Sequence, residues 1–360
     1  MTAETRTPAF CTQCRSRCGC EAITADGRLL RLEPLPSHPS GDKLCPKGRA
    51  APELVEHPER LLSPMRRTRP KEDPDPGWVP ISWDEALETI AGQMRRIAEQ
   101  YGPEQVAFSV TTPSGTHLQD SIAWIERLIR AYGSPNTIYS TEICNWHKDF
   151  ASRFTYGWDI GTPDFANTDC VLLWGHNPQS SWLARAGEVQ KAVRRGARMV
   201  VIDPRPTTLA RRADFWLQVR PGTDQAVALG LASLVIGSGH FDRDFVARWT
   251  NGPFLVREDN GRFLTEADIT PSGSTSAFMV ATAGTSIAAA SNVDASKTEI
   301  DATRTLRTLN GDVRCRTAFS LYRQACDSWP PDRVAAATGV SAEALRAAAD
   351  LLSKAKSVAY

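Results

Sequence analysis

Residues 11–20 read CTQCRSRCGC, and residues 45–49 read CPKGR. The thiols follow the spacing C-x2-C-x3-C-x26-C, with three close together and a fourth alone: Cys11, Cys14, Cys18 and Cys45. Four thiolates can hold either a zinc ion or an iron–sulfur cluster. Structural zinc sites usually pair their ligands as two short C-x2-4-C steps, whereas a three-plus-one split followed by Cys-Pro is more typical of a [4Fe–4S] cluster. The spacing favours the cluster over zinc and leaves Cys20 as a competing third ligand.

Length and composition limit the class of protein. The chain has 360 residues, enough for two or three domains, with 41% hydrophobic and 23% charged residues, as in an ordinary globular protein. A net charge of +1 gives no field that would attract nucleic acid or a membrane surface, and no apolar run predicts a transmembrane helix. The N-terminal residues contain no signal core, so we expect a cytoplasmic protein with reduced thiols and no direct membrane insertion.

The first part of the chain is predicted from turn and cap signals. Asp26-Gly27 between apolar runs indicates a β-hairpin, and the basic, Pro-rich residues 64–80 indicate a surface linker. Ser82 with Glu85 forms a capping-box pattern that opens a helix, which Gly102 ends. We expect that helix to bury one stripe of apolar residues: Leu87, Ile90, Ala91, Met94, Ile97 and Ala98.

Short apolar strands and helices then alternate along the chain. We expect strands at 106–110, 137–140, 170–174 and 199–202, and helices at 122–132, 182–194, 225–236, 318–329, 332–338 and 341–353. Apolar strands separated by helices predict an α/β fold with a doubly wound, mostly parallel sheet. Residues 260–311 show little periodicity, and we expect an irregular excursion or a hairpin region there.

The predicted elements divide the chain into four segments. Residues 1–60 would form a small cluster domain, residues 61–112 the first segment of a second α/β domain, and residues 113–352 an α/β dinucleotide-binding domain. Residues 353–360 read as a strand that has only begun and would start a return to the preceding domain. We therefore expect the chain to be the front part of a longer protein.

Three loops follow strands or precede a helix at one predicted edge of the sheet. They are Trp174-Gly175-His176-Asn177-Pro178, Asp203-Pro204-Arg205 and Pro221-Gly222-Thr223-Asp224. In open α/β sheets, ligands bind outside the carboxyl ends of the strands. A glycine allows close approach of the backbone, an aspartate can bind a ribose hydroxyl or a base edge, and an arginine can bind phosphate. Each loop alone could be an ordinary turn, but three on one edge favour a nucleotide-like ligand.

Taken in this order, the motifs resemble the dimethyl sulfoxide reductase family of molybdenum or tungsten enzymes. The resemblance implies a [4Fe–4S] cluster on the four cysteines and a bis(molybdopterin guanine dinucleotide) cofactor carrying Mo or W. It also implies that Lys47 lies on an electron path between cluster and pterin. Residues of the three loops would hold one guanine dinucleotide: Trp174, Gly175, Asn177, Asp203, Arg205, Gly222 and Asp224.

The resemblance also implies a protein ligand to the metal near Cys144, after the short strand at 137–140. A thiolate is a soft donor that suits molybdenum or tungsten, although a buried structural cysteine is the alternative. His147 lies three residues further and could exchange a proton with substrate, or could pack in the interior.

The resemblance implies an oxidoreductase that acts on a small-molecule substrate and passes electrons through the cluster to a redox partner protein or a ferredoxin-like subunit. Oxo-transfer or reduction of a sulfur compound fits best. Asn145, where formate dehydrogenases have histidine, counts against a formate dehydrogenase-like enzyme, and Arg15, where acetylene hydratases have an acid, counts against hydration. A non-redox hydratase or transhydroxylase on the same cofactor stays open, as does an electron-transfer subunit with the cluster but without molybdenum or tungsten.

Overall fold

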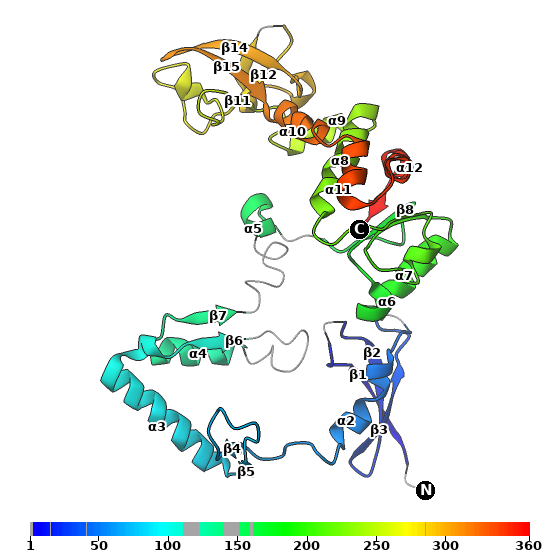
Figure 1. The fold of residues 1–360 in the computed structure, drawn as a ribbon, viewed down its shortest axis with the longest axis vertical. Coiled ribbons are helices and arrows are strands. Elements are labelled where there is room, and N and C mark those ends of the chain that lie inside the picture. Colours follow the sequence, from blue (N-terminus) through cyan, green and yellow to red (C-terminus); the bar gives the residue numbers. More distant parts are fainter. Residues whose placement is uncertain are drawn as a thin grey trace. The chain divides into compact units, whose positions relative to one another are not determined.

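The computed structural model describes residues 3–14, 16–40, 42–110, 122–139, 151–158, 161–284 and 286–360. The chain divides into two units, whose helices and strands are labelled in Figure 1. The first comprises Met1–Pro163 with Pro178–Glu188, and the second comprises Asp164–Asn177 with Val189–Tyr360.

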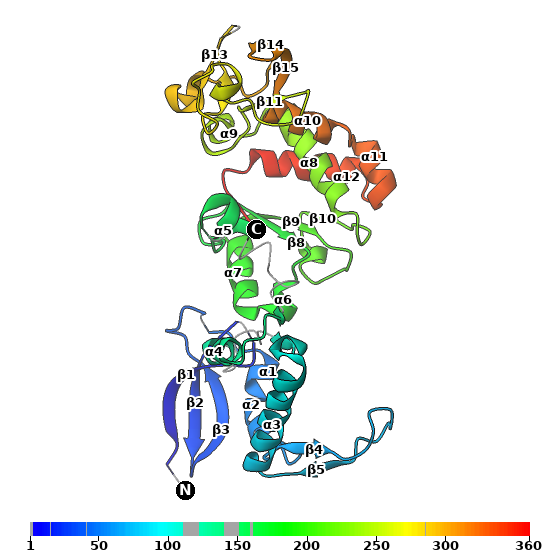
Figure 2. The same ribbon diagram turned by 90° about the vertical axis from the view of Figure 1, so that its left-hand side faces the viewer.

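The first unit begins with an antiparallel sheet of three strands in the order β1-β2-β3, which lie side by side in Figure 2. The predicted hairpin is confirmed: Asp26 and Gly27 have φ of 50° and 74°, which suits a tight turn between β2 and β3. Two short helices follow and pack against β3. The bounds are β1 (Thr5–Phe10), β2 (Gly19–Ala25), β3 (Arg28–Pro34), α1 (Pro46–Arg49) and α2 (Ala51–Val55).

The rest of the first unit holds a small hairpin and a helix–strand pair. Residues 64–80, expected to be a linker, contain the paired strands β4 (Met65–Arg67) and β5 (Trp78–Pro80). The helix predicted at Ser82 is present, since the Ser82 side chain accepts a hydrogen bond from the Glu85 backbone N–H at 3.1 Å. The remaining bounds are α3 (Trp83–Tyr101), η1 (Pro103–Gln105), β6 (Phe108–Val110), α4 (Ile122–Tyr132), β7 (Thr137–Tyr139) and α5 (Ala151–Tyr156).

The predicted buried stripe of α3 is only partly correct. Met94, Ile97 and Ala98 are half-buried, and the hydroxyl of Tyr132 in α4 donates to the Met94 carbonyl at 2.9 Å. Leu87 and Ile90, by contrast, are 59% and 57% exposed.

The second unit is built on a parallel sheet in the order β10-β9-β8-β16, as the alternating pattern predicts. Successive residues of the strands point to opposite faces. Val171, Leu173, Met199 and Val201 pack with Val189 of α7 on one face. Val200, Ile202 and Leu217 pack with α8, α11 and α12 on the other, so both faces are covered (Figure 2). The strands are β8 (Cys170–Trp174), β9 (Arg198–Ile202), β10 (Phe215–Leu217) and β16 (Val358–Ala359).

The helices of this part of the chain start and stop close to the predicted positions. Ser341 caps α12 by accepting from the Ala344 backbone N–H at 3.1 Å. The bounds are α6 (Pro178–Ser181), α7 (Leu183–Arg194), η5 (Ala210–Arg212), α8 (Asp224–Ser238), α9 (Arg243–Trp249), α10 (Ala318–Asp327), α11 (Pro331–Thr338) and α12 (Ala342–Lys354). The predicted domain boundaries stay a prediction.

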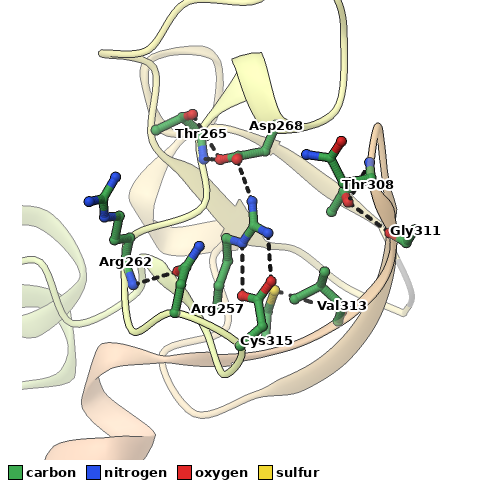
Figure 3. A network of polar contacts seen from close by, with 11 residues as sticks. Arg257, Arg262, Thr265, Asp268, Thr308, Gly311, Val313 and Cys315 are labelled. Carbon is green, nitrogen blue, oxygen red and sulfur yellow. Dashed lines mark hydrogen bonds and ion pairs between the residues drawn. The ribbon is translucent and has the colours of Figure 1, made fainter.

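Residues 251–317 form a lobe of small antiparallel sheets; it includes residues 260–311, where we expect an irregular excursion or a hairpin region and where β12 and β13 pair antiparallel. Its three-stranded sheet has the order β11-β15-β14, and β12 pairs with β13. The Arg257 side chain, 9% exposed, pairs with Asp259 at 2.7 Å and with Asp268, which also accepts from Thr265 (Figure 3). The bounds are β11 (Leu255–Arg257), η6 (Glu266–Asp268), β12 (Met279–Ala281), β13 (Ile287–Ala289), η7 (Ala290–Asn292), η8 (Ala295–Lys297), β14 (Thr303–Thr308) and β15 (Gly311–Thr317).

Among the described residues, none of the helices combines the length and the apolar character that spanning a membrane would require.

Candidate functional site

The four spaced cysteines line one cavity of the first unit. The cavity has a volume of about 230 Å³, and Cys11, Cys14, Cys18 and Cys45 all contribute to its wall. Cys11 follows β1 and Cys18 precedes β2, and the backbone N–H of Cys11 donates to the Cys18 carbonyl at 2.8 Å. Cys45 directly precedes α1. The sheet therefore brings the ends of the first thiol group together, and the loop after β3 returns the fourth thiol to them.

The fifth nearby thiol does not line this cavity. Cys20 lies in β2, is 1% exposed, and packs in the core with Leu32, Leu44 and Ala51. From the sequence alone, either Cys18 or Cys20 could be the third ligand. In the structure Cys18 lines the cavity and Cys20 does not.

The thiols are electrostatically suited to bind a cation. Burial raises the pKa of Cys11, and it raises the pKa of Cys18 to about 11, with smaller contributions from the neighbouring cysteines. Among the described residues these cysteines form no disulfide. A metal centre that replaces the thiol protons would relieve the repulsion between thiolates, so metal binding here releases protons.

The sequence spacing of the thiols favours a cluster over a single zinc ion, because a three-plus-one split is more typical of a [4Fe–4S] cluster. Four thiols that line one cavity can supply the four corner ligands of such a cube.

The cavity has two further walls. Lys47 of α1 contributes a cationic residue to the cavity wall, and its predicted place on an electron path stays a prediction. The other wall comes from α6 and the start of α7, which sequence reasoning missed: Gln179, Ser180, Ser181, Trp182 and Leu183. The Arg185 guanidinium lies 5.6 Å from the centre of the Trp182 ring and pairs with Glu188 at 3.1 Å. The residues directly after the Trp-Gly-x-Asn-Pro motif therefore face the cysteines.

Two of the three predicted ligand loops are joined by a hydrogen bond in the second unit. Trp174 ends β8, and its indole Nε1–H donates to Oδ1 of Asp224 at 2.7 Å. Asp224 opens α8 and is exposed, whereas Trp174 is half-buried against the core. The structure thus brings together two candidate residues that are 50 positions apart in the chain.

The remaining loop, Asp203-Pro204-Arg205, is held by hydrogen bonds from strand β10 and from the residue that follows it. The Trp216 indole donates to the Asp203 carbonyl at 2.8 Å, and the Gln218 amide donates to the Pro204 carbonyl at 3.1 Å. Oδ1 of Asp203, which is 7% exposed, accepts from the Arg205 backbone N–H at 2.7 Å. Arg205 itself is exposed. A buried carboxylate with an exposed guanidinium beside it suits a nucleotide.

Two glycines leave room at this edge. Gly175 and Gly222 have φ of 58° and 82°, and a Cβ at either would meet nothing within 4 Å. Positive φ favours glycine, and the open space allows a ligand to approach the backbone. Asn177 lies directly before α6. The donor set and the open backbone fit the phosphates and base of a guanine dinucleotide, so the residues present fit the group.

Two predicted site residues cannot be placed. Cys144 and His147 lie outside the described residues. Their roles as metal ligand and proton-transfer group stay predictions.

Comparison with known proteins identifies the family. A model of molybdopterin oxidoreductases matches residues 60–357, and a model of the molybdopterin oxidoreductase Fe4S4 domain matches residues 4–57. The molybdopterin-containing subunit of thiosulfate reductase from Salmonella typhimurium is 36% identical over 251 residues, which cover 69% of this chain and 32% of that protein. Acetylene hydratase from Syntrophotalea acetylenica is 32% identical over 247 residues, covering 67% of this chain and 33% of that protein.

The fold agrees with a solved structure of a relative. The structure of acetylene hydratase from Pelobacter acetylenicus superposes with a TM-score of 0.68 at 24% identity, covering 98% of this chain and 40% of that one. The chain spans 32% and 33% of the two curated relatives named above, so it corresponds to about a third of their length. The matches confirm the resemblance that the motifs predict: the chain belongs to the molybdopterin oxidoreductase family and carries that family's Fe4S4 domain.

Proposed function

We propose that the chain is the front part of a molybdenum or tungsten oxidoreductase that reduces a sulfur compound or removes an oxo group from its substrate. The observation that carries this proposal is the cavity in which Cys11, Cys14, Cys18 and Cys45 meet Lys47. A cluster beside a cationic side chain is a means of moving single electrons.

The residues of the second unit would hold one guanine dinucleotide of the cofactor. Asp203 and Asp224 supply carboxylates, Arg205 a guanidinium, and Gly175 and Gly222 open backbone, while Trp174 fixes Asp224. The metal of a bis-pterin cofactor supplies two-electron chemistry, and the protein contributes orientation and electrostatics. Cys144 is proposed as the protein ligand to that metal, and His147 as the group that moves a proton at the substrate.

Lys47 is proposed to act on the electron path. Lys47 lines the cavity that would hold the cluster, and a positive charge near the cluster would stabilise its reduced form. Reduction of a substrate requires a supply of electrons to the cluster, so we propose a redox partner protein or a ferredoxin-like subunit as the electron donor.

The similarity to thiosulfate reductase supports reduction of a sulfur compound. The similarity to acetylene hydratase supports a second candidate, hydration of a small unsaturated molecule without net redox change. Arg15 counts against hydration, because acetylene hydratases have an acidic residue at this position, directly after the second cluster cysteine.

The whole protein, purified without oxygen, distinguishes the two candidates. Molybdenum, tungsten and iron are measured first. The dithionite-reduced protein, freed of excess reductant, is then mixed with thiosulfate or dimethyl sulfoxide, and the cluster absorbance is followed. We expect one of these acceptors to reoxidise the cluster. Metal-loaded protein that hydrates acetylene, and whose cluster neither acceptor reoxidises, would contradict the reductase proposal. Iron without molybdenum or tungsten would indicate an electron-transfer subunit instead.

A further inference from the structure

A chain of polar contacts lies beside the cysteine cavity, at the residue that follows Cys18. The backbone N–H of Gly19 donates to Oγ of Ser40 at 2.8 Å. That hydroxyl lies 2.8 Å from Nδ1 of His38, which also accepts from the Ser40 backbone N–H at 3.1 Å. Because Nδ1 accepts from a backbone N–H, we assign the imidazole proton to Nε2, and the hydroxyl of Ser40 donates to Nδ1. The hydrogen bonds therefore run from Gly19 through Ser40 to His38.

The same three residues are packed without room for a side chain. A Cβ on Gly19 would lie 2.2 Å from Cβ and Cγ of His38. The Leu35 backbone N–H donates to the Gly19 carbonyl at 3.2 Å, so both backbone polar groups of Gly19 bond to residues 35–40. His38 and Ser40 are half-buried, and the loop that holds them is framed by three prolines: Pro34, Pro36 and Pro39. We call Gly19, His38 and Ser40 the Gly19 clamp.

The position of the clamp matters because the fourth thiol is distant in sequence. Between Cys18 and Cys45 lie 26 residues, and residues 35–44 carry the chain back to the cavity. Closing such a loop costs conformational entropy. The clamp fastens the first part of this loop to the residue next to Cys18. Gly19 also separates two buried thiols: Cys18 lines the cavity, whereas Cys20 does not, although both pack in the same small core.

We propose that His38 and Ser40 are positioning residues for the metal centre: through Gly19 they hold the loop of Cys45 against the Cys18 corner, with Cys18 facing the cavity and Cys20 facing the core. The inference rests on the proposed function, because it concerns a cluster on the four cysteines. Neither His38 nor Ser40 is proposed as a ligand.

The test measures how fast the cluster is lost to a chelator. The whole protein, purified without oxygen, is mixed with bathophenanthroline disulfonate, and iron release is followed by absorbance. Ser40→Ala removes the acceptor of the Gly19 N–H, and we expect iron release to be about five- to tenfold faster, as the loss of one part-buried hydrogen bond implies. Ser40→Thr keeps the hydroxyl and is expected to restore the wild-type rate. If the loop contributed only through its packing, the rate of iron release would not follow the presence or absence of the hydroxyl at position 40.

A matched control is available in the same unit. His57 also accepts, on Nδ1, from a backbone N–H two residues ahead, that of Glu59 at 3.2 Å, but it lies outside the clamp. We expect His57→Ala to release iron at the wild-type rate, and His38→Ala to accelerate release. Because His38 acts through Ser40, the double variant His38→Ala/Ser40→Ala should be little faster than Ser40→Ala alone. Cys20→Ala should keep its cluster.

The outcomes separate this inference from the proposed function. Wild-type protein without a four-iron cluster would refute the proposed function. A wild-type cluster whose release rate is unchanged in both Ser40→Ala and His38→Ala would refute the clamp alone. A Ser40→Thr variant as fast as Ser40→Ala, or loss of the cluster in Cys20→Ala, would likewise overturn the inference.

Discussion

Replacing Trp174 by phenylalanine tests how the nucleotide edge is built. The ring is kept, but the indole N–H that donates to Oδ1 of Asp224 at 2.7 Å is lost. A hydrogen bond to a charged group contributes about 1.5–3 kcal/mol when buried. Asp224 is exposed, so water can replace part of that contact, and we expect roughly 1 kcal/mol of binding energy at most. Trp174→Phe should therefore weaken binding of a guanine nucleotide about threefold to fivefold.

The assay uses GDP as a fragment of the cofactor. Protein produced without cofactor is titrated with GDP and with ADP in a calorimeter. We expect wild-type protein to prefer GDP, and Trp174→Phe to lose part of that preference, because Asp224 is no longer fixed. Trp249→Phe is the matched control, since the side chain of Trp249 is 73% exposed and lies in α9.

The results have distinct meanings. Equal GDP affinity in wild type and Trp174→Phe would refute the role of the indole donor. Failure of wild-type protein to bind GDP in preference to ADP would refute the nucleotide site itself.

Three further perturbations test other parts of the structure. Replacing Arg257 by methionine should lower the free energy of unfolding by about 2–3 kcal/mol in urea denaturation at pH 7, because it leaves Asp268 without its cationic partner. Burial alone would raise the pKa of Asp268, but hydrogen bonds from Thr265 and the charge of Arg257 lower it. The difference in the free energy of unfolding between variant and wild type should therefore persist above about pH 4 and shrink as the pH falls further. A difference that does not change with pH would contradict the ion-pair account. In cluster-free protein, the rate at which iodoacetamide alkylates Cys18 should rise with pH and reach half its maximum near pH 11, because burial raises the pKa of this thiol. Mass spectrometry of the labelled peptide measures this, and half-maximal labelling near pH 8 would refute the effect of burial. Gly48→Ala should reduce the iron content, because its Cβ would lie 2.5 Å from Cδ1 of Leu44 and 3.4 Å from Sγ of Cys11; unchanged iron content would show that Leu44 yields freely.

The sequence predicts the parts of this fold that depend on local signals. The turn at Asp26-Gly27, the cap at Ser82 and the cap at Ser341 each depend on residues close in the chain, and each is found. The apolar strands Cys170–Trp174 and Arg198–Ile202 are long and uniform enough to mark a sheet covered on both faces. The cysteine spacing similarly predicts which thiols can share a cavity.

Other features depend on contacts that periodicity does not encode. In residues 251–317 the strands β11, β12 and β13 have only three residues each, which is too short to show a pattern, and the buried Arg257 helps to hold this region together. β14 and β15 do alternate between more exposed and more buried positions, a signal that sequence reasoning missed. The stripe of α3 is apolar, yet Leu87 and Ile90 are exposed. A helical pattern shows which face prefers burial but does not show which element covers it.

The candidate site shows the same division. The ligand residues carry recognisable motifs, but the residues that hold them do not. Ser40 and His38 act on Gly19 across 21 and 19 positions, and a serine or histidine in a Pro-rich loop is no signal in itself. The Trp174–Asp224 hydrogen bond likewise spans two loops that the sequence places on one edge without pairing them.

The most direct test of the account is the metal content and spectrum of the whole protein purified without oxygen. We predict four irons per chain bound to Cys11, Cys14, Cys18 and Cys45, broad visible absorbance that bleaches on reduction, and a paramagnetic signal from the reduced cluster. Zinc in place of iron, with no visible absorbance, would contradict the assignment of this cavity.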